Sequence, residues 1–143
     1  MQIRLAQIND SDSISHLLLQ LGYTLSSAEV ESMIFSHRQQ DNDIYVMVQA
    51  EDIVAVMSLI YFDYFPDAKR ICRITSLVVD EQLRGHGLGR KFVSFAKARA
   101  IDKQCYSLEL TTNMRRHQTH RFYEQQGFDK TSYKFVMPLS STN

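Results

Sequence analysis

The chain has no excess of charge of either sign. Its 143 residues carry 16 basic and 16 acidic side chains, so the formal net charge is zero. A surface that binds nucleic acid needs a basic excess, so we expect no nucleic-acid partner. No apolar run approaches the roughly 18 residues of a membrane span, and the first residues lack the apolar core of a signal peptide. We therefore expect no membrane association and a cytoplasmic location.

Cysteine is also scarce, with Cys72 and Cys105 the two in the chain. Neither belongs to a CxxC or Cys/His pattern, so no metal site is expected. Both are expected in strands, as buried thiols in a reducing compartment. Repeats, linkers and low-complexity stretches are missing too, and 143 residues with a hydrophobic fraction of 44% suit one domain over residues 1–143.

The spacing of apolar residues predicts a mixed α/β fold with the element order β-α-α-β-β-β-α-β-α-β. The side chains of Ile3 and Leu5 in the first strand are expected to point into the core. The second helix is expected to bury Val30, Met33 and Ile34. Residues 37–43 and 62–67 are expected to be loops. The predicted strands are 2–7, 44–49, 53–61, 70–79, 106–111 and 128–137; the predicted helices follow the capping residues 9–11 and 26–27, the glycine-rich segment 84–89 and residue 118.

The helix between the strand that ends at Leu77–Val79 and the strand around Leu108 predicts one right-handed parallel crossover. Ligands in such sheets bind outside the carboxyl ends of strands, where neighbouring strands diverge. A glycine-rich turn lies at that end of the first of these strands. We therefore expect the ligand there.

This turn belongs to the most informative stretch, LVVDEQLRGHGLGR at residues 77–90. A β-branched strand leads through a polar corner into a glycine-punctuated turn that opens a helix. The first N–H groups of a helix have no intrahelical partner, and the helix dipole adds positive potential there. Glycines let a ligand approach the backbone closely. With Arg84 and Arg90 on either side, the expected ligand is a phosphate or pyrophosphate.

Two common phosphate motifs do not fit this turn. The dinucleotide fingerprint GxGxxG fails because Phe92 stands at its third glycine, and the phosphate loop GxxxxGK[ST] fails because no Gly-Lys-Ser/Thr occurs. Arg-x-x-Gly-x-Gly after a Leu-Val-Val strand instead resembles the pyrophosphate-binding motif of the GCN5-related N-acetyltransferases, which hold acetyl-coenzyme A. The alternative is a turn that merely joins strand to helix.

A second stretch strengthens the resemblance. Residues 120–128, HRFYEQQGF, resemble the pattern of that superfamily in which a Tyr on a short helix precedes Gly-Phe. Residues 112–123, followed by Tyr133-Lys134-Phe135, are similar to the aminoalkylphosphonate N-acetyltransferases, a branch that acetylates small amines bearing an acid group. The chain departs from the superfamily before the turn, where Arg73, Thr75 and Ser76 stand in a region that often carries an acidic residue.

The resemblance implies a single N-acetyltransferase domain over residues 1–143, with a twisted, mixed and mostly antiparallel central sheet and helices on both faces. It implies that backbone groups of the strand end pair with the pantetheine arm, and that the turn anchors the pyrophosphate. The implied cofactor-binding residues are Leu77, Val78, Val79, Arg84, Gly85, His86, Gly87, Leu88, Gly89, Arg90, Asn113 and His120.

The resemblance also implies catalytic and substrate-binding residues. Tyr123 is the candidate general acid, because a phenol of pKa about 10 can protonate a departing thiolate; a packing role is the alternative. Glu109 is a candidate base that acts through a water, because a carboxylate is unusual in a strand that is expected to be buried on both faces. A structural ion pair is the alternative for Glu109, and the histidines at 117 and 120 or bulk water are the other candidates for the base. Arg115 and Arg116 are expected to bind an acidic substrate or the cofactor's 3′-phosphate, with a solvated charge run as the alternative.

The sequence therefore predicts an enzyme that moves an acetyl group from acetyl-CoA to the primary amine of a small molecule, such as an aminoalkylphosphonate. Two alternatives stay open: a protein N-terminus or lysine as acceptor, and a non-catalytic module that binds acetyl-CoA. A homodimer is also left open.

Overall fold

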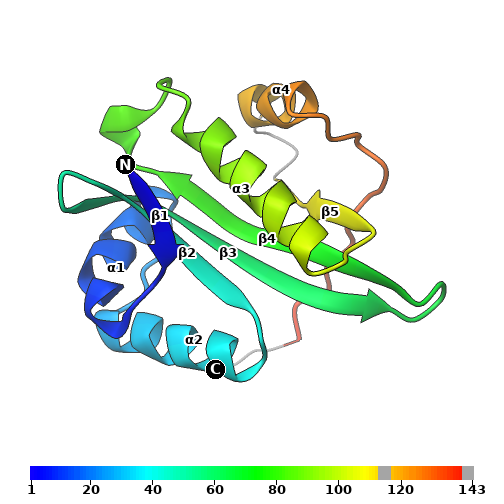
Figure 1. Cartoon of the computed structure of the whole chain (residues 1–143), viewed down its shortest axis with the longest axis horizontal. Helices are drawn as coiled ribbons and strands as arrows, with labels where there is room; N and C mark the ends of the chain where they lie inside the picture. Colours follow the sequence, from blue (N-terminus) through cyan, green and yellow to red (C-terminus); the bar gives the residue numbers. More distant parts are fainter. Residues whose placement is uncertain (113–116, 140–143) are drawn as a thin grey trace. The chain divides into compact units, whose positions relative to one another are not determined.

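A computed structural model describes residues 1–112 and 117–139 of the chain. The chain divides into two compact units, Met1–Leu110 and Thr111–Asn143. The first unit is built on a five-stranded sheet with the strand order β1-β2-β3-β4-β5 (Figure 1). Its strands are β1 (Gln2–Leu5), β2 (Asp43–Gln49), β3 (Asp52–Tyr64), β4 (Lys69–Val79) and β5 (Ser107–Leu110).

Three helices of the first unit cover the two faces of this sheet (Figure 1). They are α1 (Ser11–Gln20), α2 (Ser27–Gln39) and α3 (Leu88–Asp102), with short 3-10 turns at Ile8–Asp10 and Glu81–Leu83. The second unit contains α4 (His117–Gln125). Neighbouring strands from β1 to β4 are antiparallel, and β4 and β5, which flank α3, are parallel. The predicted mixed α/β fold with a parallel crossover is therefore confirmed.

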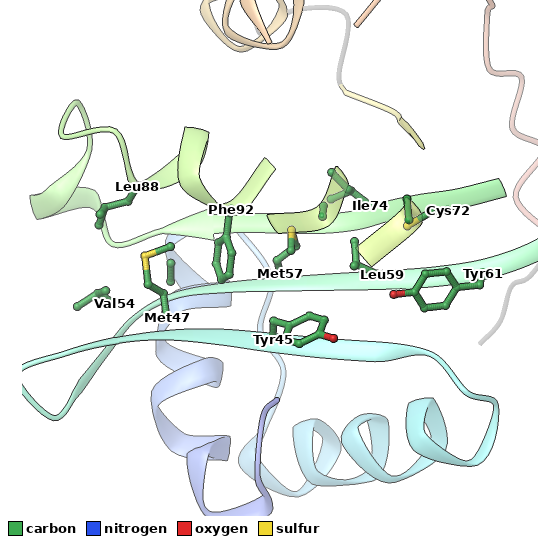
Figure 2. Close-up of a cluster of buried hydrophobic side chains, with 13 residues drawn as sticks. Tyr45, Met47, Val54, Met57, Leu59, Tyr61, Cys72, Ile74, Leu88 and Phe92 are labelled. Carbon is green, nitrogen blue, oxygen red and sulfur yellow. The ribbon is translucent and has the colours of Figure 1, made fainter. Parts of the chain in front are cut away.

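Alternation along the strands builds a separate core on each face of the sheet. On one face, α3 packs Phe92, which is fully buried, against strand residues such as Met57 and Leu59 (Figure 2). On the other face, α1 and α2 pack against Val46 and Val56. Because side chains of a strand alternate between faces, neighbouring residues such as Val56 and Met57 serve different cores.

Several predictions near the N-terminus are wrong in detail. Leu5 is 48% exposed, and the neighbouring Ala6 is buried in its place. Met33 is also exposed, so the buried face of α2 is formed by Val30 and Ile34. Asp10 does not cap α1 with its side chain. Its carboxylate instead takes part in the turn before the helix, which sequence spacing cannot distinguish from a cap.

Two elements extend beyond their predicted ends. The α2 helix continues through polar residues to Gln39, so most of the expected 37–43 loop is helix or its cap. The β3 strand continues to Tyr64, because residues 62–64 pair with residues 69–71 of β4. In both places, hydrogen bonding to regular structure outweighs the polar or aromatic composition of the segment. The expected cap of α2 is confirmed: Ser26 Oγ accepts a bond from Glu29 N at 3.1 Å.

The end of the chain differs most from the prediction. Residues 128–139 contain neither helix nor strand, so the strand expected at 128–137 is wrong for the described residues. Cys72 is buried in β4, whereas Cys105 is only half-buried and precedes β5 rather than lying in it. Every helix within residues 1–112 and 117–139 is too short or too polar to span a membrane.

Candidate functional site

The β4 strand has an open edge over its last residues. It pairs with β5 only from Ile71 to Ile74, although it continues along β3 as far as Val79. Within the described parts of the chain, no strand pairs with this edge of β4 after Ile74. Backbone N–H and C=O groups on such an edge can pair with an extended ligand that contains amides. The open edge therefore spans residues 75–79.

A β-bulge marks the start of this open edge. Ser58 pairs with Ser76, but the next residue of β3, Leu59, pairs with Ile74, so Thr75 is an extra residue in β4. A bulge of this kind bends its strand and increases the local twist. It lies at the point where pairing with β5 stops, so the bulge and the open edge are one structural feature.

The turn after β4 is held by its own side chains. Asp80 Oδ1 accepts a bond from Gln82 N at 3.0 Å, and Arg84 Nε donates to the carbonyl of Val79 at 3.2 Å. The ring of His86 lies with Nδ1 3.1 Å from the carbonyl oxygen of Leu83. These contacts connect the turn to the end of β4. They therefore hold the backbone of residues 80–86 in place after the open edge.

The glycines of this turn lead into a helix N-terminus that has no side-chain cap among the described residues. Gly85 and Gly87 have φ of +84° and +83°, a region that residues with a Cβ rarely adopt. Gly87 is the N-cap of α3, and the first turn contains no acidic residue. The first intrahelical bond runs from Lys91 N to the carbonyl of Gly87. The N–H groups of residues 88–90 therefore have no intrahelical acceptor.

Positive charge lies at the same helix end. A Cβ placed on Gly87 would lie 3.7 Å from Nη2 of Arg90, so that guanidinium reaches back over the turn. With the helix dipole, it favours an anion as the missing cap. The predicted phosphate-binding role of residues 84–90 is consistent with this geometry.

The side chains of the strand end and of Leu88 belong to the cores. Leu77, Val79 and Leu88 pack in the α3-side core, and Val78 packs in the core under α1 and α2. Figure 2 shows Leu88 in the first of these cores. Its exposed fraction is 5%. Any contact of these residues with a ligand would use the backbone. Their apolar character is therefore compatible with the predicted binding role.

A cluster of hydroxyl groups lies at the bulge. Ser58 Oγ is 2.6 Å from Thr75 Oγ1 and 2.7 Å from Ser76 Oγ. Thr75 is exposed and the two serines are half-buried. Sequence reasoning missed this cluster, because the register of β3 against β4 is needed to bring Ser58 beside the other two.

Glu109 forms an ion pair with Arg73, its direct neighbour in the β4–β5 register. Glu109 Oε2 lies 2.7 Å from Nε and 2.5 Å from Nη2 of Arg73. The two side chains are 37% and 40% exposed. The expectation that β5 is buried on both faces is therefore wrong, because all four of its residues are half-buried. The ion-pair alternative is present in the structure, and the role of Glu109 as a base stays a prediction.

The remaining predicted residues belong to the second unit. The Tyr123 ring on α4 packs edge-on against Phe122 and Phe128, with centroid distances of 5.1 Å and 5.7 Å. His120 lies one helical turn before it, on the same side of α4. Both side chains are half-buried, and both roles stay predictions. The predicted residues Asn113, Arg115 and Arg116 lie outside the described residues.

The open edge of β4 and the uncapped N-terminus of α3 together fit a ligand in which an extended chain with amides is joined to a phosphate. The edge of β4 suits the amide chain, and the N-terminus of α3 with Arg84 and Arg90 suits the phosphate. The two features follow each other directly in the chain, so one ligand can reach both.

Known proteins align with nearly the whole of this chain. An aminoalkylphosphonate N-acetyltransferase from Salmonella typhimurium is 25% identical over 140 residues, which cover 96% of this chain and 91% of that protein. The crystal structure of glucosamine-6-phosphate N-acetyltransferase from Arabidopsis thaliana matches with a TM-score of 0.84 and 25% identity, covering 97% of this chain and 98% of that one. An acetyltransferase from Trypanosoma brucei matches in fold with a TM-score of 0.83 and 24% identity, covering 96% and 99% of the two chains.

A family model gives the assignment. The model described as "Acetyltransferase (GNAT) family" matches residues 11–128, which include the open edge of β4, the glycine turn and α4. The match spans parts of both units. The chain therefore belongs to the acetyltransferase (GNAT) family.

Proposed function

We propose that this protein is an N-acetyltransferase that moves an acetyl group from acetyl-CoA to the primary amine of a small molecule with an acidic group. One observation carries the proposal. In a chain of the GNAT family, the open edge of β4 leads directly into a helix N-terminus that lacks a side-chain cap. This arrangement supports a cosubstrate that contains both amides and phosphates.

The first unit supplies the residues that would hold the donor. Backbone groups of residues 77–79 pair with the amides of the pantetheine arm, as a further strand would. The N–H groups from Gly85 to Arg90, with the guanidinium groups of Arg84 and Arg90, bind the pyrophosphate. Acetyl-CoA supplies the acetyl group as a thioester, which is activated toward an amine.

Three roles in the transfer fall to residues of this chain. The carbon–nitrogen bond forms as the carbon–sulfur bond breaks, the amine loses a proton, and the sulfur gains one. A backbone N–H of Val78 or Val79 polarises the thioester carbonyl. The hydroxyl of Tyr123 gives its proton to the leaving sulfur. The proton of the amine passes to water, with Glu109 as the candidate group that assists.

The names of two relatives support an acidic acceptor. An aminoalkylphosphonate and a glucosamine-6-phosphate each combine an amine with a phosphorus acid, and both relatives align with nearly this whole chain. Arg115 and Arg116 are further candidates for the acidic group, or for the 3′-phosphate of the cosubstrate. An arginine fork can bind such a group through two parallel hydrogen bonds, which fixes orientation as well as affinity.

Thiol release from acetyl-CoA tests the proposal when several amines are compared. The set consists of an aminoalkylphosphonate, the alkylamine of the same chain length, a polyamine, an amino acid and a peptide with a free N-terminus and a lysine. We expect the highest kcat/KM with the aminoalkylphosphonate. A peptide as the best acceptor would favour protein acetylation instead. Thiol release with none of them, despite measurable binding of acetyl-CoA, would indicate a binding module.

A further inference from the structure

We infer that Arg73 and Glu109 bind a zwitterionic acceptor as a pair, Arg73 through the anionic group and Glu109 through the ammonium. The inference rests on the proposed function and deepens it. It assigns acceptor specificity to two residues of the first unit that face each other across β4 and β5.

The position of the pair supports this role. Arg73 and Glu109 are paired one step before Ile74 and Leu110, the last pair of the β4–β5 ladder. The bulge residue Thr75 and the open edge of β4 begin directly after it. An amine bound at the pair would therefore lie beside the start of the edge along which the acyl donor is proposed to bind.

The geometry of the pair leaves hydrogen-bonding groups available to a ligand. Nε and Nη2 of Arg73 both approach one oxygen of Glu109, Oε2. Within residues 1–112 and 117–139, neither Oε1 of Glu109 nor Nη1 of Arg73 has a hydrogen-bond partner. An ammonium can donate to the first, and an anionic group can accept from the second. The half-exposed side chains leave both groups within reach.

An aromatic ring holds the guanidinium in place. The Cζ atom of Arg73 lies 4.8 Å from the centroid of the Phe62 ring on β3. Stacking on a ring suits the planar guanidinium and limits its rotation. A side chain that is already ordered loses less entropy when it binds a ligand. Phe62 therefore prepares Arg73 for binding.

Charge accounts for the selection of a zwitterion. The pair carries one positive and one negative charge, so an acceptor with the same two charges can satisfy both. A cationic amine would leave Arg73 without an added partner and would meet its repulsion. The hydroxyls of Ser58, Thr75 and Ser76 continue the polar surface along the neighbouring positions of the strands. These groups add hydrogen bonds without adding a charge.

Kinetics with two matched amines test the inference. One amine is an aminoalkylphosphonate, and the other is the alkylamine of the same chain length that lacks the phosphonate. Both are assayed with the variants Arg73→Ala and Glu109→Gln. Arg70→Ala is the control, because it removes the same charge from the same strand. In the unmodified protein, Cζ of Arg70 lies 5.7 Å from the centroid of the Tyr61 ring. Exposed ion pairs add little to stability, so the variants should fold.

We expect Arg73→Ala to raise KM for the aminoalkylphosphonate by about tenfold or more, the scale of a lost charge-assisted hydrogen bond. Its KM for the alkylamine should not rise, because that amine has no anionic group for Arg73 to bind and is relieved of the repulsion of the guanidinium. Glu109→Gln should lower kcat/KM for both amines, because both present an ammonium. Arg70→Ala should change neither. An equal effect of Arg73→Ala on both amines, or no effect on either, would overturn the inference.

A charge swap separates binding from a purely structural role. The double variant Arg73→Glu with Glu109→Arg restores an ion pair across the same register. We expect kcat/KM for the aminoalkylphosphonate to stay low, because a zwitterion that satisfies the swapped pair binds in reverse and carries its amine at position 73. Recovery of the original kcat/KM would overturn the inference and leave the acetyltransferase proposal intact. Absence of thiol release from the unmodified protein with every amine would overturn the proposed function, and the inference with it.

Discussion

Two carboxylates in the first unit, Asp10 and Asp43, are held by specific side-chain partners. Asp10 is 7% exposed and accepts two bonds from the guanidinium of Arg4, at 2.8 Å and 3.0 Å. Asp43 accepts a 2.6 Å bond from the hydroxyl of Tyr61 and a longer one from Tyr45. Burial, with the nearby carboxylate, raises the pKa of Tyr45 to about 12. Burial raises the pKa of Tyr61 as well, so both phenols stay protonated and keep donating at any ordinary pH.

The ion pair of Asp10 predicts a stability that depends on acid pH. Burial by itself raises the pKa of this carboxyl, but hydrogen bonds from Arg4 and from the backbone N–H of Gln7 hold it below its ordinary value. A lowered pKa in the folded state adds stability that is present above the unfolded pKa of about 3.9. This contribution is lost as pH falls through the folded-state pKa.

Asp10→Asn should therefore destabilise the protein at pH 7 by about 2 kcal/mol, the scale of hydrogen bonds to a charged group. Denaturant unfolding of both proteins between pH 7 and pH 2 measures this. The difference should be constant above roughly pH 5 and shrink below roughly pH 4 as the carboxylate is protonated. A difference that does not change down to the lowest pH would contradict the ion-pair account.

The Tyr123 hydroxyl is predicted to act in turnover and not in packing. Tyr123→Phe keeps the ring contacts with Phe122 and Phe128 and removes one oxygen. We expect kcat to fall by about 10²-fold or more, the usual scale for a general acid, with acetyl-CoA affinity unchanged. Tyr64→Phe, at the end of β3, is the matched control and should keep full activity. Unchanged kcat in Tyr123→Phe, with chemistry shown to be rate-limiting, would move the acid role to another group.

Helices α2 and α3 begin in opposite ways. Ser26 and Glu29 satisfy each other's backbone N–H groups at the start of α2, whereas α3 begins at a glycine with no side chain to do so. Such reciprocal capping stabilises a helix end in water. Its absence at α3 leaves donors for an anion. The difference between the two helices is therefore the structural basis of the proposed phosphate site.

Replacing the glycine at this helix start should separate binding from folding. Gly87→Val places a Cβ at φ +83° and adds bulk where the phosphate is proposed to bind. Gly22→Val is the matched control, because φ is +98° there and, apart from its chain neighbours, no atom of the described residues lies within 4 Å of an added Cβ. Both variants should lose about 1–2 kcal/mol from the strained backbone.

Of the two variants, only Gly87→Val should lose affinity for acetyl-CoA, by about tenfold or more if one charge-assisted bond is lost. Isothermal titration with acetyl-CoA gives both affinities. An equal loss of affinity in the two variants would assign the effect to general destabilisation and not to the turn.

At the same scale, the sequence predicts the β4–turn–α3 segment well and the element ends poorly. The β4 strand and α3 have long, regular apolar patterns with a glycine-rich turn between them, so propensity and packing agree there. The ends of α2 and β3 depend on hydrogen bonds to neighbouring segments, which composition does not reveal. The bulge at Thr75 is set by register between strands, and register is a tertiary property.

For the whole molecule, the parts of the site that lie close together in sequence could be predicted, and the parts that meet only through the sheet could not. The phosphate turn is contiguous in sequence, so its chemistry can be read from residues 77–90. The contact between Arg73 and Glu109 joins residues 36 positions apart, and the hydroxyl cluster at Ser58 joins residues 17 and 18 apart. Side chains that meet through the sheet can be recognised only after the strands are aligned.

The binding of acetyl-CoA is the central claim for the molecule as a whole, and thermal unfolding tests it directly. A ligand that binds the folded state at one hundred times its Kd adds about 2.7 kcal/mol of stability. For a chain of this size, the melting temperature should rise by roughly 5–10 °C. Inorganic pyrophosphate at the same concentration, which lacks the amide arm, should produce a much smaller rise. An unchanged melting temperature of the unmodified protein at saturating acetyl-CoA would contradict the account.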